Sequence, residues 1–328
     1  MQKNTPDNEI DFAVAMLKGG GLVAIPTETV YGLSGNALSD TAVADIYALK
    51  ERPSFNPLIV HVSSIDTAKK YVQWNERAEI LAEKFWPGSL TLVLPRKEKC
   101  ELSLLVSAGL DCVAVRVPAH PVALALLEKS GLPLAAPSAN KSGRVSPTCA
   151  QHVRDEFGDD LMVLDGGECM VGIESTIVDL TTMPATILRH GKIIREDLEK
   201  YIAIGKYNSD EIKASGMLKS HYAPNANLRM NADSIEDVEA LLAFGKPFSF
   251  PSTTGTRRNI YVAGEGNIIE NLSESENLEE AAANLFRMLR LLDAKNPKAI
   301  AVMKIPDRGL GIAINDRLQR AAAPKYFR

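Results

Sequence analysis

The chain has 328 residues, of which 45% are hydrophobic and 24% charged, so it is long enough for two domains and has a globular composition. Its net charge of −4 excludes a generally basic nucleic-acid-binding protein, although a local basic groove stays compatible with it.

In chain order, residues 1–203 predict an α/β domain with a mixed, twisted sheet, because helices and strands follow one another without a steady strand–helix–strand rhythm. The expected strands are Leu22–Ile25, the run around Val60, Leu90–Leu94, Cys112–Val117, Leu134–Ala136, Met162–Leu164, Thr176–Leu180 and Ala185–Leu188. The expected helices are Asp11–Lys18, one capped by Asp40 that leads to Lys50, one capped by Asn75, Pro121–Lys129, and one with Ser146 as cap and Pro147 at its first position.

Residues 204–224 are polar and irregular, which predicts a linker. Residues 225–328 then predict a strand, a helix, a strand, a long helix, a strand and a helix. The long helix has apolar residues from Leu278 to Leu292 at helical spacing, and Ala299–Met303 is continuously apolar, as in a parallel strand covered on both faces. We expect a smaller, Rossmann-like α/β domain.

Several classes of site are excluded by missing patterns. The four cysteines are widely spaced without a C-x-x-C pair and the five histidines are scattered, so we expect no protein-bound metal cage. The chain has neither a Walker A loop nor a G-x-G-x-x-G motif, so nucleotide chemistry would need another cradle. The apolar runs are strand-sized and the first residues lack an apolar signal segment, so we expect a cytoplasmic location without membrane association.

Polar residues follow the first strand and the helix after it. Pro26 ends the strand, and the Thr-Glu-Thr segment after it presents hydroxyl groups. Lys50 and Arg52 lie at the end of the next helix, where a proline-flanked loop is expected to point them outward. Two cations near hydroxyl groups suggest an anion site, and an ordinary solvated helix end is the alternative. His61, inside an apolar strand, reads by itself as a core histidine.

Arg116 lies inside the expected strand Cys112–Val117 and needs a partner if it is buried. Its planar fork suits a carboxylate ligand, and a structural ion pair with Asp111 or another acid is the alternative. Ser138 and Asn140 place a hydroxyl and an amide at a strand-to-loop turn, which alone is commonplace.

Three blocks in order carry a family resemblance: Pro26 to Leu33 with the Lys50 to Val62 segment, Pro137 to Asn140, and Gly172 to Ile177. They resemble the threonylcarbamoyl-AMP synthases with a YrdC-type domain, over roughly the first 200 residues. The linker block Lys219 to Pro224 resembles that family's K-x-H-Y-A-P motif. Two positions depart from it: Cys112 replaces a threonine of some relatives, and Ser215 replaces a proline before Gly-Met.

The resemblance implies a role for each matching residue. The implied L-threonine ligands are Thr29, His61, Arg116, the backbone at Ala136, and Ser175. The implied ATP ligands are Arg52, Asn56, the backbone at Cys112, Ser138, Asn140, Ser146, Arg189 and Tyr222. Lys50 and Arg52 would be catalytic by holding phosphates, and Ser138 and Ser146 would bond them near a helix start. Tyr222 would reach back from the linker to the nucleotide, so that residues 204–224 would act as a lid that shields the intermediate from water. A solvated hinge is the alternative for the linker.

The implied activity is a nucleotidyltransferase reaction in which L-threonine, bicarbonate and ATP give threonylcarbamoyl-AMP and pyrophosphate. The product would pass to the proteins that form N6-threonylcarbamoyladenosine in tRNA. Mg2+ is expected to accompany ATP, although no carboxylate cluster marks its ligands. A related carbamoyl-transfer enzyme and a double-stranded RNA-binding module with a concave basic face are the alternatives, and weak RNA binding would show a steep salt dependence that ATP binding lacks.

Overall fold

The computed structural model of the chain describes residues 5–207, 212–236, 238–246 and 268–324. The chain divides into two compact units, one of residues 1–142 and 146–218 and the other of residues 143–145 and 219–328. The boundaries 203/204 and 224/225 stay predictions, and residues 208–211 of the predicted linker lie outside the described residues.

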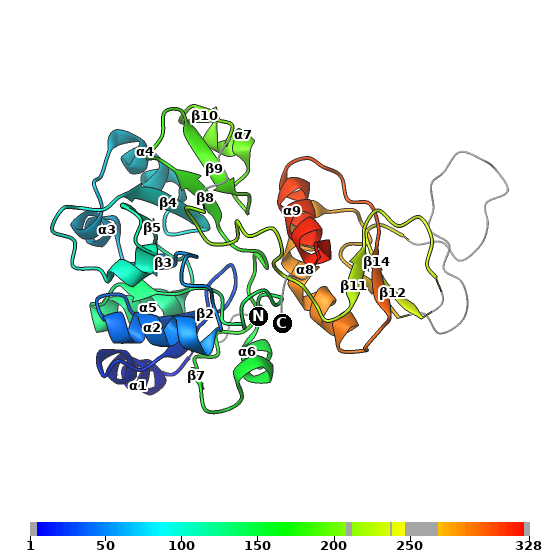
Figure 1. The fold of residues 1–328 in the computed structure, drawn as a ribbon, viewed down its shortest axis with the longest axis horizontal. Helices are drawn as coiled ribbons and strands as arrows, with labels where there is room; N and C mark the ends of the chain where they lie inside the picture. The colour runs from blue at the N-terminus through cyan, green and yellow to red at the C-terminus, as the bar shows by residue number, and fades with distance from the viewer. Residues whose placement is uncertain (1–4, 208–211, 237, 247–267, 325–328) are drawn as a thin grey trace. The chain divides into compact units, whose positions relative to one another are not determined.

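Among the described residues, ten strands of the first unit form one mixed sheet in the order β10-β9-β8-β4-β5-β3-β6-β2-β1-β7 (Figure 1). The strands are β1 (Val23–Ile25), β2 (Gly32–Asn36), β3 (Ile59–His61), β4 (Leu90–Pro95), β5 (Cys112–Arg116), β6 (Leu134–Ala135), β7 (Met162–Val163), β8 (Thr176–Asp179), β9 (Ala185–Arg189) and β10 (Ile204–Gly205). The mixed α/β sheet expected from the sequence is confirmed. β10 pairs with β9, so the sheet continues into the first residues of the predicted linker.

The helices of the first unit begin and end largely where local signals place them. They are α1 (Asp7–Lys18), α2 (Asp40–Leu49), α3 (Ile65–Tyr71), α4 (Glu76–Phe85), the short 3-10 helix η1 (Leu104–Ser107), α5 (Pro121–Ser130), α6 (Ala150–Phe157) and α7 (Arg195–Leu198). Asn75 caps α4, and Pro121 opens α5, as predicted. The cap of α2 is Ser39, whose hydroxyl accepts from the Ala42 N–H, and Asp40 is the first helical residue.

The helix predicted to begin at Ser146 is a correction. α6 begins at Ala150, after Cys149. The Ser146 hydroxyl donates to Glu174 Oε1 at 2.5 Å, and the Pro147 carbonyl accepts from the Tyr31 N–H at 2.9 Å. These long-range bonds hold the segment away from helical geometry, although Ser-Pro is a good local helix start.

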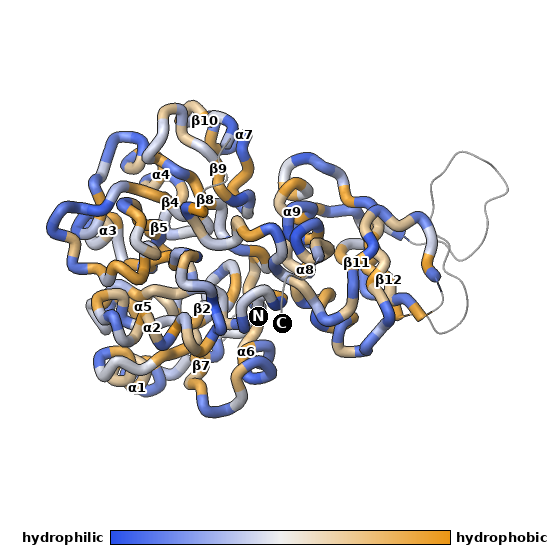
Figure 2. The backbone as a smooth tube through the Cα atoms, in the orientation of Figure 1, coloured by the Kyte–Doolittle hydropathy of each residue, from blue (hydrophilic) through white to orange (hydrophobic). Residues whose placement is uncertain are grey.

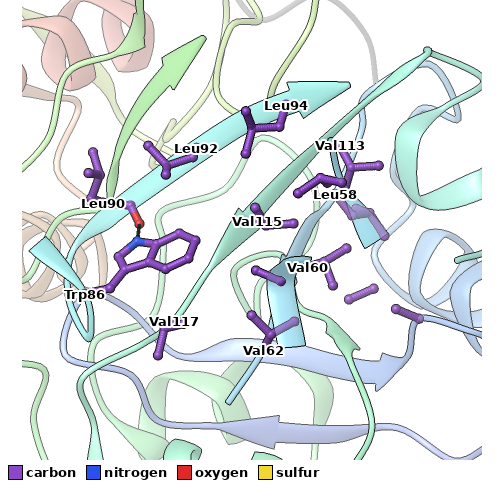
Figure 3. Packing of buried hydrophobic residues seen from close by; sticks show 14 of the residues in the cluster. Leu58, Val60, Val62, Trp86, Leu90, Leu92, Leu94, Val113, Val115 and Val117 are labelled. Atoms are coloured by element: carbon purple, nitrogen blue, oxygen red, sulfur yellow. Dashed lines mark hydrogen bonds between the residues drawn. The ribbon is translucent and has the colours of Figure 1, made fainter. Parts of the chain in front are cut away.

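One face of the sheet is a hydrophobic core covered by α2, α3 and α4. Alternate residues of the three central strands and their flanks point into it, as Figure 3 shows for Leu58, Val60, Val62, Leu90, Leu92, Leu94, Val113, Val115 and Val117. Trp86 joins this cluster and donates its indole N–H to the Leu90 carbonyl at 2.6 Å. The hydropathy colouring of Figure 2 is correspondingly apolar along most of β4.

The opposite face carries the residues between these. Because side chains alternate along a strand, His61, Thr91 and Arg116 point to this face together with the apolar Ile59, Val93 and Ala114. At one end of the sheet, α1 packs on α5, and Val23, Ile25 and Leu134 are buried in the cluster that these helices cover. At the other end, Ala214 and Met217 pack on the apolar patch around Ile177. This second face holds the polar groups described below.

The second unit has a parallel sheet of four strands among its described residues, in the order β11-β14-β12-β13. Its elements are β11 (Asn227–Arg229), β12 (Glu239–Ala243), β13 (Ile269–Asn271), α8 (Leu278–Asp293), β14 (Ala299–Val302) and α9 (Leu310–Ala322). The long helix and the buried parallel strand β14 are confirmed. No helix lies between β11 and β12 in the described residues, contrary to prediction, because 239–243 form a strand and the connection is short.

Residues 247–267 of the second unit lie outside the described residues. Within the described part of the chain, no helix has the length and hydrophobicity that crossing a membrane requires.

Candidate active site

Arg116 ends β5 beside His61 at the end of the parallel strand β3, and the two residues are partners in the strand register. The guanidinium of Arg116 is 3% exposed and forms an ion pair with Glu28. Its Nη1 donates to Thr29 Oγ1 at 3.0 Å and its Nε to the Gly88 carbonyl at 2.9 Å. Of the two alternatives left by the sequence, an ion pair is therefore present, with Glu28 and not with Asp111.

Arg116 has more N–H donors than its contacts among the described residues use. A guanidinium has five N–H groups, and the bonds to Glu28, Thr29 and Gly88 use three of them among the described residues. One N–H remains on each terminal nitrogen, which is the number that a bidentate carboxylate ligand takes.

Glu28 belongs to the same cluster as Arg116, and reasoning from the sequence assigned it no separate role. It is 8% exposed, and its carboxylate also accepts from Ser89 Oγ at 3.2 Å and from the Ala119 N–H at 3.0 Å. Burial raises the pKa of Glu28, but the charge of Arg116 and the Ala119 N–H outweigh it, so the pKa lies below the ordinary value. An acid between two threonines directly after a buried strand was the available signal.

His61 is 3% exposed, and its Nδ1 has no hydrogen-bond partner among the described residues. Burial, aided by the charge of Arg116, lowers the pKa of His61 to about 3. The ring is therefore neutral at pH 7 and offers one donor and one acceptor. It is buried as a core histidine would be, but a fully satisfied core histidine has both nitrogens bonded.

Lys50 and Arg52 point inward, which corrects the expectation that the loop directs them outward. Lys50 is the C-cap of α2 and is 1% exposed. Its Nζ donates to the Ser138 carbonyl at 2.5 Å and to the Asn140 carbonyl. Burial and the neighbouring charge of Arg52 lower the pKa of Lys50 well below its ordinary value. Lys50 thus ties the end of α2 to the loop after β6.

Arg52 is 8% exposed and is held by the loop that follows it. Its Nε donates to the Asn56 carbonyl at 3.0 Å, and its Nη2 donates to the Pro57 carbonyl and to Ser215 Oγ, each at 2.9 Å. The Asn56 side chain is fully buried, and neither its oxygen nor its nitrogen has a partner among the described residues. Such a group marks a place where a polar ligand would be stabilising.

Ser175 and Arg189 extend the site across β8 and β9. Arg189 is 6% exposed and donates from Nε to the Ser175 carbonyl at 3.0 Å and from Nη2 to Ser175 Oγ at 3.1 Å. The Ser175 hydroxyl is also bonded to Thr91 Oγ1 at 2.7 Å. The Thr176 N–H donates to the Ser89 carbonyl, and Ser89 bonds Glu28, so a continuous network reaches Arg116.

The remaining predicted residues of the first unit lie around this network. The Ala136 N–H donates to the Ile59 carbonyl at 3.0 Å. Ser138 forms an isolated antiparallel β-bridge with Gly32. Cys112, the first residue of β5, is the strand partner of Pro95 in β4. Ser146 lies against Glu174, and not at a helix start as was expected.

Tyr222 alone among the predicted site residues belongs to the second unit. Its ring is stacked on Phe286 with centroids 5.4 Å apart, and the Arg317 guanidinium lies 5.6 Å from the ring centroid. Tyr222 is 1% exposed and has a positive φ of 62°. The predicted linker tyrosine is therefore packed among helices α8 and α9.

The donor set does not make a metal cage. The described residues contain no group of three or more His, Cys, Asp or Glu side chains that could hold a metal ion. What the first unit assembles is a neutral histidine, a carboxylate-paired arginine with two spare donors, and two further buried arginines, which together suit a substrate with a carboxylate and phosphates.

Comparison with known proteins identifies the family. The family model described as Telomere recombination matches residues 15–191, and the model described as Threonylcarbamoyl-AMP synthase, C-terminal domain, matches residues 193–323. The threonylcarbamoyl-AMP synthase of Pyrococcus abyssi is 40% identical over 333 residues, covering 98% of this chain and 96% of the relative. That of Bacillus subtilis is 40% identical over 336 residues, covering 99% and 96%.

A solved structure agrees with these matches. The crystal structure of P. abyssi Sua5 complexed with L-threonine superposes with a TM-score of 0.85 at 36% identity, covering 98% of this chain and 96% of that one. Sequence and fold therefore agree over almost the whole length, and the chain belongs to the threonylcarbamoyl-AMP synthase family.

Proposed function

We propose that the second face of the first unit's sheet converts L-threonine, bicarbonate and ATP into threonylcarbamoyl-AMP and pyrophosphate. The observation that carries this proposal is the donor arrangement at Arg116, which keeps two N–H groups for a carboxylate while Glu28 balances its charge. The network from Arg116 through Glu28, Ser89 and Ser175 to Arg189 supports one continuous site.

In this proposal, L-threonine lies between Arg116 and His61. Arg116 binds its carboxylate, and the neutral imidazole of His61 bonds a polar group of the substrate. Thr29, the backbone at Ala136, and Ser175 line the same pocket. A site that hydrogen-bonds the substrate hydroxyl rejects analogues lacking it, because its own buried groups would then be unpaired.

ATP lies beside it in the proposal, against Arg52, Asn56 and Arg189. Arg52 and Arg189 are buried and pre-positioned, so they stabilise phosphate charge without reorganising. Asn56 brings an amide whose two polar atoms are unpaired among the described residues. The further proposed ATP contacts are Ser138, Asn140, Ser146, the backbone at Cys112, and Tyr222. Lys50 would support catalysis by holding the loop 138–140.

The chemistry needs no covalent enzyme intermediate. The threonine amine and bicarbonate give a carbamate with loss of water. A carbamate oxygen then bonds the α-phosphorus of ATP, the bond from that phosphorus to the bridging oxygen breaks, and pyrophosphate leaves with the electron pair. Positioning and charge stabilisation by the arginines are the catalytic contributions that such a step requires.

Mg2+ is proposed to arrive with ATP. Glu28 pairs with Arg116, Glu174 accepts from Ser146, and the described residues contain no group of three or more His, Cys, Asp or Glu side chains that could hold a metal ion. The phosphate oxygens of ATP, together with water, would therefore be the ligands of the ion. We also propose that the reaction is cytoplasmic and that the product passes to proteins that modify tRNA.

The test is pyrophosphate release from the full-length protein with each substrate omitted in turn. We expect release only when L-threonine, bicarbonate and ATP are all present, with D-threonine and glycine poor substitutes. Turnover with glycine equal to that with L-threonine would refute the substrate assignment. An RNA-binding module would instead bind duplex RNA with a steep salt dependence and release no pyrophosphate.

A further inference from the structure

Residues 212–217 lie on the second face of the sheet and are attached there at three points. Lys213 Nζ lies 3.5 Å from Asp179 Oδ2, a fully buried carboxylate at the end of β8. Ala214 is buried in the apolar patch of that face, and Met217 packs beside it. Ser215, between them, is 9% exposed and forms hydrogen bonds through its hydroxyl and its carbonyl.

Ser215 touches both of the buried arginines. Its hydroxyl accepts from Arg52 Nη2 at 2.9 Å and donates to the Pro57 carbonyl at 2.9 Å, and the same Nη2 donates to that carbonyl at 2.9 Å. The Ser215 carbonyl accepts from Arg189 Nη1 at 3.3 Å. One residue thus joins a guanidinium on the loop after α2 to a guanidinium on β9.

These contacts restrict how the two arginines can move. Two of the Arg52 acceptors, the Asn56 and Pro57 carbonyls, belong to the arginine's own loop, so they move with it. The Ser215 hydroxyl ties the guanidinium to a segment distant in the chain, whose carbonyl also accepts from Arg189, and Arg189 is itself held by Ser175. Hydrogen bonds to charged groups are among the stronger ones in proteins, so this bridge limits the separation of the two cations.

We infer that Ser215 is a positioning residue that holds Arg52 and Arg189 at a fixed separation for the phosphates of ATP. The inference rests on the proposed function, in which both arginines bind ATP. Preorganised cations lose less free energy to reorganisation when the charged ligand binds, so the bridge should act on ATP affinity more than on threonine affinity.

The rival explanation is that Ser215 only attaches the segment to the sheet. Lys213 provides the matched control, because it attaches the same segment to the sheet through the ion pair with Asp179. Ser215→Ala removes the hydroxyl bridge and keeps the carbonyl, whereas Lys213→Ala removes the ion pair and keeps the bridge.

The experiment measures KM and kcat for ATP and for L-threonine in the full-length protein, with calorimetric ATP affinity and the melting temperature alongside. We expect Ser215→Ala to raise the KM and Kd for ATP by about tenfold, the loss of one charge-assisted hydrogen bond, with the threonine KM within about twofold of wild type. Lys213→Ala should leave both KM values near wild type. Ser215→Cys, which keeps a side chain of similar size but replaces the hydroxyl acceptor of Arg52 with a weaker sulfur acceptor, should raise the KM and Kd for ATP as Ser215→Ala does.

Equal effects of Ser215→Ala and Lys213→Ala on ATP would overturn the inference in favour of simple attachment. Unchanged ATP affinity in both Ser215 variants would overturn it as well. Neither outcome touches the proposed function as long as the wild-type protein binds ATP and releases pyrophosphate. If the wild-type protein binds no ATP, the proposed function itself fails.

Discussion

Glu28 and Arg116 form a buried ion pair between the loop after β1 and the end of β5, although 87 residues of chain separate them. The pair keeps a guanidinium inside the protein while two of its donors stay available to a ligand. The acid is thus as necessary to the proposed carboxylate site as the arginine.

Single substitutions at this pair should be more damaging than the double substitution. Glu28→Gln or Arg116→Met leaves the partner charge buried and uncompensated, which should cost about 3–5 kcal/mol of unfolding free energy. The double variant removes both charges, so its cost should be smaller than the sum of the two. The measurement is urea unfolding of the wild-type protein, the two single variants and the double variant, which together form a double-mutant cycle. Additive losses of unfolding free energy would show that the two charges do not compensate each other.

His61 should make stability depend on pH between neutrality and acid. In the unfolded chain it takes up a proton near its ordinary pKa of 6.5, whereas the folded pKa is about 3. Below pH 6.5 the unfolded state therefore binds more protons, and unfolding free energy falls with falling pH, by about 2 kcal/mol between pH 6.5 and pH 5. The His61→Gln variant lacks this group, so its unfolding free energy should fall by about 2 kcal/mol less than that of the wild-type protein over the same pH range. Burial lowers the pKa of His120 too, but His120 is present in both proteins and its effect cancels.

Lys50→Met should lower both stability and turnover. It removes the donor to the buried carbonyls of Ser138 and Asn140, each of which then costs about 1–3 kcal/mol. The loop 138–140 should shift, and turnover should fall by about 10²-fold, as when a preorganised group of an active site is lost. Lys141→Met is the matched control, because its ion pair with Glu51 is at the surface and worth about 1 kcal/mol or less. Similar losses in both variants would contradict a special role of Lys50.

Tyr222 should be probed by Tyr222→Phe. Its ring is packed against Phe286 and Arg317, so Tyr222→Ala should cost about 3–5 kcal/mol and cannot separate folding from function. Tyr222→Phe keeps the ring, and a contact of the hydroxyl with ATP should show as a higher KM for ATP at an unchanged melting temperature. An unchanged KM would show that the linker tyrosine acts through packing alone.

A truncation tests whether the predicted linker acts as a lid that shields the intermediate from water. The chain should be cut after Leu218, because Ala214, Ser215 and Met217 pack within the first unit. We expect the shortened protein to fold and to turn over well below the rate of the full chain. A full rate in the shortened protein would leave the linker as a tether.

The sequence was sufficient for the fold class and for the family, because the strand pattern, the helix caps at Asn75 and Pro121, and the motif blocks are all local signals. The sequence was not sufficient where contacts between residues far apart in the chain determine whether a side chain is buried or caps a helix. Lys50 and Arg52 look solvated from their loop, but their acceptors include Ser138 and Ser215, far along the chain. Ser146 caps no helix because Glu174 takes its hydroxyl.

Two residues show the same limit at the site. Glu28 had a polar setting but no local sign that its partner was Arg116, which only the sheet brings near. Ser215 was seen only as a departure from the family motif, because a serine in a polar stretch gives no indication of two arginine contacts.

The strand order also determines when the site can form during synthesis. β4 lies between β5 and β8, and β1 pairs with β7, so early strands wait for partners made much later. Lys50 leaves the ribosome 88 residues before its acceptor Ser138, and Arg52 leaves 163 residues before Ser215. At about 5–20 residues per second these delays are roughly 4–33 s. A nascent chain therefore carries the buried-type cations Lys50 and Arg52 before these acceptors exist, and a chain released early should be a client of chaperones and proteases and not a partly active enzyme.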